Sequence, residues 1–196
     1  ERTSFWSKMK NLREMNLLVI VLLAGIILAF TSEFFFTWNN IKVVLSSFAT
    51  DGIVVIGMTI MLIIGGIDLS VGSVMCLSMT ICALLFLAGV NPWLAALIAI
   101  AACVLIGLII GVIVTRLGLT YFIVTLAFMG IARGLVLILS GGTPVSIVAE
   151  LDAQMLFKSL GQGQLFGIIP MQVVIFLVIM LISDYVVRSS SSMRLV

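Results

Sequence analysis

The 196-residue chain contains no histidine. Imidazole is the usual general base, a common metal ligand and a member of Ser-His triads, so Ser-His hydrolases and His-ligated metal or haem sites are excluded. The three cysteines, Cys76, Cys82 and Cys103, lie inside apolar runs without a Cys-x-x-Cys pair. We therefore expect buried small side chains rather than disulfides or zinc ligands, and no cofactor.

Charged residues are equally scarce. They make up 9% of the chain, whereas 63% is hydrophobic and the mean hydropathy is +1.39. A soluble domain has about 25% charged residues, and a chain of this length has too little interior to hide so much apolar surface from water. The net charge of +2, with no basic patch among aromatics, predicts no nucleic-acid partner. The composition predicts an all-α protein embedded in a lipid bilayer.

The apolar runs divide into six candidate spans. A hydrocarbon core about 30 Å thick requires about 20 apolar residues of helix. The uncharged stretch from Leu69 to Thr115 would be about 70 Å long as one helix, so we expect it to turn back at Asn91-Pro92-Trp93. The sequence thus predicts a polytopic transmembrane helix bundle with spans at residues 17–36, 41–65, 69–88, 94–115, 121–139 and 169–187.

The basic residues predict the orientation of these spans. If residues 1–16 are cytoplasmic, the outer segments hold only Lys42 and Lys158, and the cytoplasmic segments hold Arg2, Lys8, Lys10, Arg13, Arg116, Arg188 and Arg194. Both termini, including the tail 188–196, are then cytoplasmic, and the loop 140–168 lies outside. Apolar residues at helical spacing in this loop predict a short surface helix; they are Ile147, Val148, Leu151 and Met155.

Three charged residues fall at or inside the apolar zone: Asp51, Asp68 and Arg133. A charge at mid-bilayer costs at least about 2.5–3.5 kcal/mol, so each should face protein, water or an opposite charge. Asp51 and Arg133 are expected in the outer half of the membrane, where they can pair, and glycines beside Arg133 favour a position facing the bundle. Two interpretations stay open: a polar path, with Ser47 on the Asp51 face, or a buried ion pair that fixes helix register.

The segment from Gly65 to Ser73, Gly-Gly-Ile-Asp-Leu-Ser-Val-Gly-Ser, is the most distinctive stretch. Glycines around an Asp/Ser pair predict a break between two helices, with Asp68 or Ser70 capping the second. No Gly-Lys-Ser/Thr is present, so nucleotide binding is not expected.

The same segment, preceded by Gly57-Met58-Thr59, resembles the signature of permease subunits of ribose-type sugar ABC importers. A second block resembles that family's central region in order and spacing; it comprises Phe122 to Leu126, Met129 to Gly134 and Gly141 to Val145. Phe35, Asn39, Asn40 and Ile41 resemble the family's sequence after the first span. The resemblance extends to about Val187.

The resemblance implies a fold like the N-terminal part of a type II ABC importer permease in a bacterial inner membrane. It also implies a path for a monosaccharide or similar polar solute, a second permease copy in a homo- or heterodimer, a separate cytoplasmic ATPase subunit and an extracytoplasmic solute-binding protein. The chain itself would be no enzyme. Candidates for docking the binding protein are Glu150, Asp152 and Lys158.

Members of that family are longer and continue into a cytoplasmic coupling segment, which the residues after Arg188 do not match. The sequence therefore looks like the N-terminal part of such a permease. Two alternatives stay open: a truncated, transport-incompetent fragment, and a small secondary transporter or channel.

Overall fold

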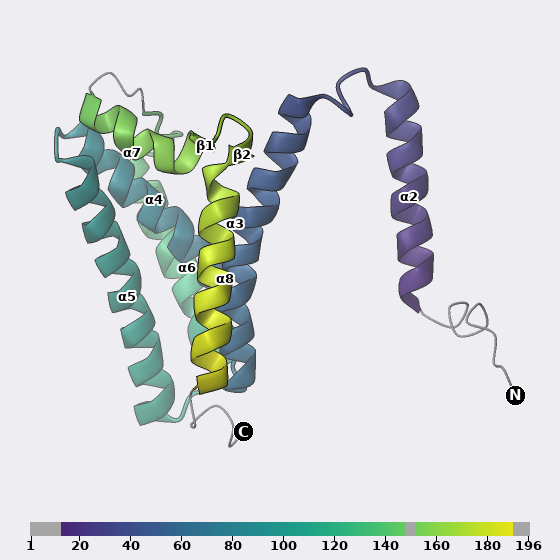
Figure 1. Ribbon diagram of the computed structural model, residues 1–196. Coiled ribbons are helices and arrows are strands. Elements are labelled where there is room, and N and C mark those ends of the chain that lie inside the picture. The colour runs from purple at the N-terminus through teal and green to yellow at the C-terminus, as the bar shows by residue number, and fades with distance from the viewer. Residues whose placement is uncertain (1–12, 148–151, 190–196) are drawn as a thin grey trace, which may run out of the picture. The chain divides into compact units, whose positions relative to one another are not determined.

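The computed structural model describes residues 13–147 and 152–189. The chain divides into two compact units, Glu1–Ser47 and Phe48–Val196, with the boundary inside helix α3 (Figure 1). The first unit holds α2 (Arg13–Thr31) and the start of α3 (Trp38–Ile63). The second holds the rest of α3, the helices α4 to α8 and a small hairpin.

The turn between α2 and α3 is built by local polar contacts. The hydroxyl of Thr37 accepts a hydrogen bond from the Asn40 backbone N–H at 3.4 Å, and the Asn40 amide donates to the carbonyl of Phe35 at 2.8 Å. These contacts cap the start of α3 and hold the preceding residues out of a helix. The expected first span continued to Phe36, but the helix ends at Thr31 because this capped turn follows it.

Helix α4 (Val71–Leu87) is central to the second unit and packs on both α5 (Pro92–Leu117) and α6 (Tyr121–Ser140). Its buried residues recur at intervals of three or four: Ser73, Leu77, Thr80, Ala83 and Phe86. On α5 the buried residues include Ala95 and Ala99, small side chains that allow close helix approach. The Cys103 thiol of α5 lies 3.8 Å from the carbonyl of Val74.

The turn between α4 and α5 occurs where the sequence predicts it. The Asn91 side chain accepts a hydrogen bond from the Trp93 backbone N–H at 3.0 Å, and Pro92 occupies the first helical position. Proline is suited to that position because its missing N–H would have no helical partner there. The prediction of a turn at these three residues is confirmed.

The segment between α6 and α8 contains a short helix, α7 (Asp152–Gln162), as expected, but of the four residues that predicted it only Met155 belongs to α7. Ile147 lies before the helix, and Val148 and Leu151 lie outside the described residues. The Phe157 ring of α7 meets Trp93 of α5 edge-on, with ring centroids 5.5 Å apart. A small hairpin follows, with two strands of two residues each. Strand β1 (Gln164–Leu165) is antiparallel to β2 (Ile169–Pro170), and Leu165 lies opposite Ile169. This hairpin is a small departure from the expected all-α fold.

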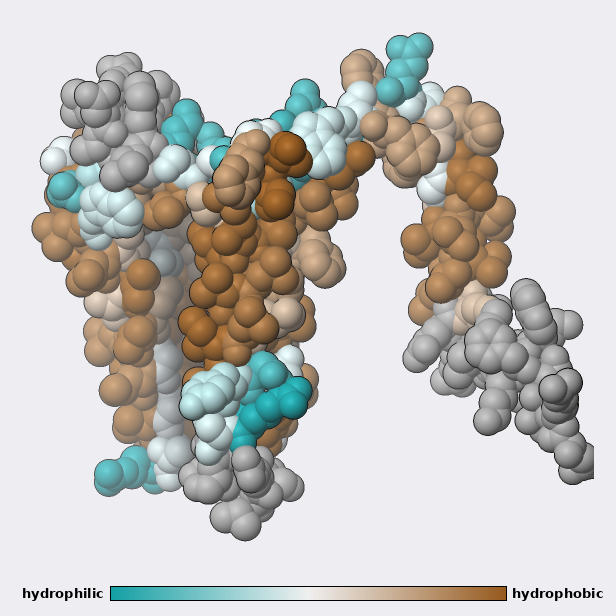
Figure 2. Space-filling model, in the orientation of Figure 1, coloured by the Kyte–Doolittle hydropathy of each residue, from teal (hydrophilic) through white to brown (hydrophobic). Residues whose placement is uncertain are grey.

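The surface of the second unit matches a bilayer. In Figure 2 hydrophobic side chains cover the visible faces of α5 and α8 (Met171–Ser189), and hydrophilic ones gather near the helix ends. Helices α3, α5, α6 and α8 are long and apolar enough to cross a membrane, and residues 17–31 and 71–87 form shorter apolar helices. Each expected span overlaps one helix, which confirms a polytopic helical fold. The span limits and orientation stay predictions.

Candidate functional site

The candidate site begins with the segment that joins α3 to α4. Gly65 adopts a φ of +84°, which a residue with a side chain rarely does. Its N–H bonds to the carbonyl of Leu62 at 3.0 Å, and the N–H of Gly66 bonds to Met61 at 2.9 Å. This pair of bonds satisfies the last carbonyls of α3 and ends the helix.

Asp68 caps the start of α4. One of its carboxylate oxygens accepts hydrogen bonds from the backbone N–H and the hydroxyl of Ser70, both at 2.7 Å. Ser70 is only 1% exposed, so its N–H has little access to water. Asp68 and Ser70 were the two expected caps. The Asp68 carboxylate accepts a backbone N–H, that of Ser70, whereas the Ser70 side chain accepts none and its hydroxyl donates to Asp68.

The first turns of α6 support this segment. Thr125 is fully buried; its hydroxyl donates to the carbonyl of Tyr121 at 2.8 Å and lies 3.4 Å from the carbonyl of Ile67. A Cβ on Gly66 would come within 3.1 Å of the Tyr121 ring. The sequence placed Thr125 inside the second motif block, but it did not predict the contact of its hydroxyl with the carbonyl of Ile67.

Asp68 and Ser70 also border a pocket of about 350 Å³ between α4 and α5. The rest of its lining is mostly apolar, with Ser78 and Cys103 as further polar side chains. One Asp68 carboxylate oxygen accepts both bonds from Ser70, which fixes this residue at the edge of the pocket.

Arg133 borders a different pocket, of about 390 Å³, between α4 and α6. Ser73 and Cys76 of α4 line the same pocket, opposite Met129 and Arg133 of α6. A second pocket of about 470 Å³ shares Cys76 and Val136 with it and extends along the helices to Thr143. We call the two together the α4–α6 groove; its other polar lining residues are Thr80, Ser140, Thr143 and Ser146.

The expected pair of Asp51 and Arg133 does not form. Both side chains are exposed, and the part of the chain that the structure describes has no ion pair between them. Near Asp51, Gly52 and Phe48 pack against the ring of Phe176 of α8. The expected pair does not form because the residues of α3 next to Asp51 pack on α8, whereas Arg133 of α6 lines a pocket with α4. Ser47 lies four residues before Asp51 on α3 and is also exposed.

The cysteines differ from expectation at one position. Cys82 and Cys103 are partly buried, but Cys76 is exposed, so the prediction that all three are buried is wrong. Its exposure follows from its place at the junction of the two pockets. Within residues 13–147 and 152–189, no three cysteine, aspartate or glutamate side chains gather where they could hold a metal ion.

The expected docking residues belong to the segment between α6 and α8. Lys158 is an exposed residue of α7, and Asp152 is the first residue of that helix. Glu150 lies outside the described residues. Lys158 is not among the residues that line the α4–α6 groove.

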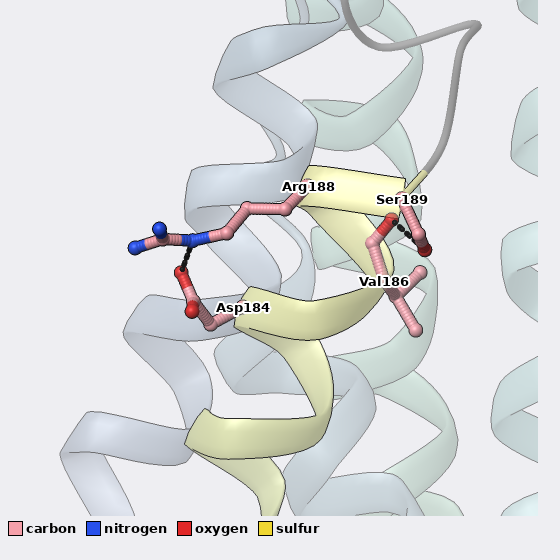
Figure 3. A network of polar contacts seen from close by, with 4 residues as sticks. All are labelled: Asp184, Val186, Arg188 and Ser189. Carbon is pink, nitrogen blue, oxygen red and sulfur yellow. Dashed lines mark hydrogen bonds and ion pairs between the residues drawn. The ribbon is translucent and has the colours of Figure 1, made fainter.

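A charged pair that sequence reasoning missed lies at the end of α8. The Arg188 Nε donates to the Asp184 carboxylate at 2.8 Å, one helical turn away, as Figure 3 shows. The Ser189 hydroxyl donates to the carbonyl of Val186 at 3.2 Å in the same turn. Both charged side chains are well exposed, so this pair adds little to stability. The spacing of four residues between Asp184 and Arg188 on one helix could have predicted the pair.

Comparison with known proteins places these features in a family. Residues 40–192 match the family described as a branched-chain amino acid transport system permease component. The ribose import permease of Escherichia coli K12 is 34% identical over 80% of this chain and 49% of its own length. That of Haemophilus influenzae is 29% identical over 91% and 54%.

A third relative, the D-allose transport system permease of Escherichia coli K12, is 33% identical over 72% of this chain and 42% of its own length. No solved structure matches the chain. The chain spans about half the length of the ribose permeases that it matches.

The family match covers both blocks that carried the resemblance, as well as the segment that ends α3 and caps α4. The relatives are sugar permeases, which confirms the resemblance to ribose-type permeases. With its apolar helices and permease relatives, the chain is a multi-pass protein of a bacterial inner membrane. The chain belongs to the family of permease components of the branched-chain amino acid transport system type.

Proposed function

We propose that the chain is the membrane-spanning permease subunit of an ATP-binding-cassette importer and forms part of the path for a monosaccharide. The observation that carries the proposal is that the relatives of the chain are permeases for sugars. They are permeases for ribose, D-allose, fructose and L-arabinose, which are all monosaccharides. The family match over residues 40–192 supports the assignment to a transport subunit.

The importer would have three further components: a cytoplasmic ATPase subunit, an extracytoplasmic solute-binding protein and a second permease copy. Both termini of this chain would be cytoplasmic, as the distribution of basic residues supports. ATP hydrolysis takes place on the separate subunit and changes the relative stability of inward-open and outward-open arrangements of the helices.

The charged residues have different parts in this proposal. Asp68 and Ser70 hold the start of α4, as their mutual bonds support. Arg133 contributes to the path, because it borders the α4–α6 groove and has no ion-pair partner in the described residues. Asp51 and Ser47 mark an exposed polar stripe on α3 that would face protein or water rather than lipid.

The solute-binding protein would dock on the outer segment that includes α7, through Glu150, Asp152 and Lys158. The exposure of Lys158 supports this placement. Charges at the edge of an interface mainly change the association rate and its dependence on salt.

The test is ATP hydrolysis by the complex that purifies with the chain from its native membrane in mild detergent. We expect an ATPase subunit in the complex, and we expect hydrolysis to rise when ribose-loaded binding protein is added. Lys158→Gln should raise the binding-protein concentration needed for half-maximal stimulation, more strongly at low salt.

The matched control is Arg116→Gln, which removes an exposed positive charge in the last turn of α5, far along that helix from the Trp93 contact with α7. It should leave the half-maximal concentration unchanged. A complex without an ATPase contradicts the proposed function. Equal responses of the two variants contradict only the docking site.

A further inference from the structure

Arg133 is an inner residue of helix α6. It lies about 10 Å from the Ser140 end of α6 and about 18 Å from the Tyr121 end, at a rise of 1.5 Å per residue. Because α6 is long and apolar enough to cross a membrane, this position falls within the hydrocarbon layer. An arginine there is costly unless its guanidinium meets water, a polar partner or a counter-ion.

Ser73 of α4 lines the same pocket as Arg133 of α6. Ser73 is only 6% exposed, and its hydroxyl has no hydrogen-bond partner among the described residues. A serine in a helix often donates to the carbonyl four residues earlier, as the Thr80 hydroxyl does to Cys76 at 2.9 Å. The Ser73 hydroxyl is therefore left for whatever occupies the pocket.

The pocket that Arg133 and Ser73 share has the size and lining of a small-molecule site. Its volume of about 390 Å³ is within the usual range of small-molecule sites, about 300–1,000 Å³. Arg133 supplies several N–H donors, Ser73 both donates and accepts, and apolar side chains such as Met129 and Leu69 form the rest. A few polar groups in an apolar wall suit a ligand that has hydroxyl groups on a carbon ring.

We propose that this pocket is a binding subsite for a monosaccharide, in which Arg133 and Ser73 hydrogen-bond its hydroxyl or ring oxygens. The inference rests on the proposed function, since the monosaccharide class comes from the relatives. It deepens that function by assigning the solute contact to the α4–α6 groove, and Ser73 joins Arg133 as a solute-binding residue. The adjoining pocket, with Ser140 and Thr143, connects the subsite to the end of α6.

Cys76 provides a natural reporter, because it is exposed and lines both pockets. The experiment uses the complete importer in membrane vesicles, with Cys82 and Cys103 replaced by alanine. A charged methanethiosulfonate reagent reacts only with a thiol that water reaches and ionises. The labelling rate of Cys76 is measured with and without D-ribose, with and without inorganic phosphate, and with a membrane-permeant maleimide as a reference.

We expect the charged reagent to label Cys76 and D-ribose to slow this labelling about tenfold when its concentration is ten times its Kd, because only the unoccupied fraction reacts. Labelling that D-ribose does not slow overturns the subsite. Absence of labelling by the charged reagent overturns it as well, since the groove would then be filled by lipid or protein. Protection by phosphate but not by D-ribose also overturns it, in favour of an anion site.

Two serine variants of α4 separate solute binding from folding. Ser73→Ala should raise the D-ribose concentration needed for half-protection about two- to tenfold, the effect of one hydrogen bond. Ser78→Ala is the matched control, because Ser78 faces the pocket between α4 and α5 instead. Equal protection in both variants contradicts the role of Ser73. If the importer still transports D-ribose in that case, the proposed function stands and only the subsite is withdrawn.

Discussion

At the scale of single residues, Asp68 shows how an ionisable side chain in an apolar region can serve structure. One of its carboxylate oxygens accepts two bonds from Ser70, so the buried Ser70 at the start of α4 has an acceptor for its N–H and its hydroxyl. A negative charge also suits the positive end of a helix. Arg133 differs, because no described residue pairs with it and it borders a pocket.

The residue-scale prediction concerns this cap. Asp68→Ala should lower the free energy of unfolding by about 1–3 kcal/mol, because it leaves the buried Ser70 N–H and hydroxyl without an acceptor. Asp68→Asn keeps an oxygen at the same place and should recover most of the loss. The measurement is unfolding of the purified protein in detergent. If alanine and asparagine destabilise equally, the negative charge rather than the acceptor matters, and the capping account is wrong.

At the scale of elements, contacts between helices depend on where glycine allows another side chain to approach. Phe176 of α8 lies over Gly52 of α3, where a Cβ would overlap its ring, and Phe48 meets the same ring edge-on at 5.9 Å. Gly57, five residues further along α3, has no such neighbour. The two glycines therefore have different roles on one helix.

The element-scale prediction compares these glycines. Gly52→Ala should be less stable than Gly57→Ala by about 1–3 kcal/mol, because the added methyl forces the Phe176 ring away from Phe48. Both substitutions gain the same helix propensity, so the difference isolates packing. Thermal unfolding of the two variants in one detergent gives the comparison. Adding Phe176→Leu to Gly52→Ala should recover stability; equal stability of the two alanine variants would refute the α3–α8 contact.

The sequence could predict the helices better than the site. Apolar runs bounded by Gly, Pro and Asn located the six apolar helices of the described residues and the turn at Asn91, because these signals are local. The early end of α2 was missed, since the capped turn at Thr37 depends on competition between two local structures. The partners of Arg133 could not be predicted, because a pairing across helices depends on which faces pack. That packing brought Ser73 rather than Asp51 to the same pocket.

At the scale of the whole molecule, family membership and the groove support one account. The family match over residues 40–192 shows a permease component and includes both motif blocks. The relatives include permeases for ribose and D-allose. The chain spans about half the length of the ribose permeases that it matches, so uptake has to be measured with the assembled importer. Under this account the groove supplies solute contacts, and the driving energy comes from a partner.

The measurement that tests this account most directly is uptake of radiolabelled D-ribose by vesicles that contain the chain with its ATPase subunit and binding protein. The account predicts accumulation above the external concentration only when ATP is supplied, and no change when an ionophore dissipates ion gradients. Accumulation without ATP, abolished by the ionophore, would contradict it and indicate a secondary transporter. Complete absence of uptake in the assembled complex would contradict the transport function itself.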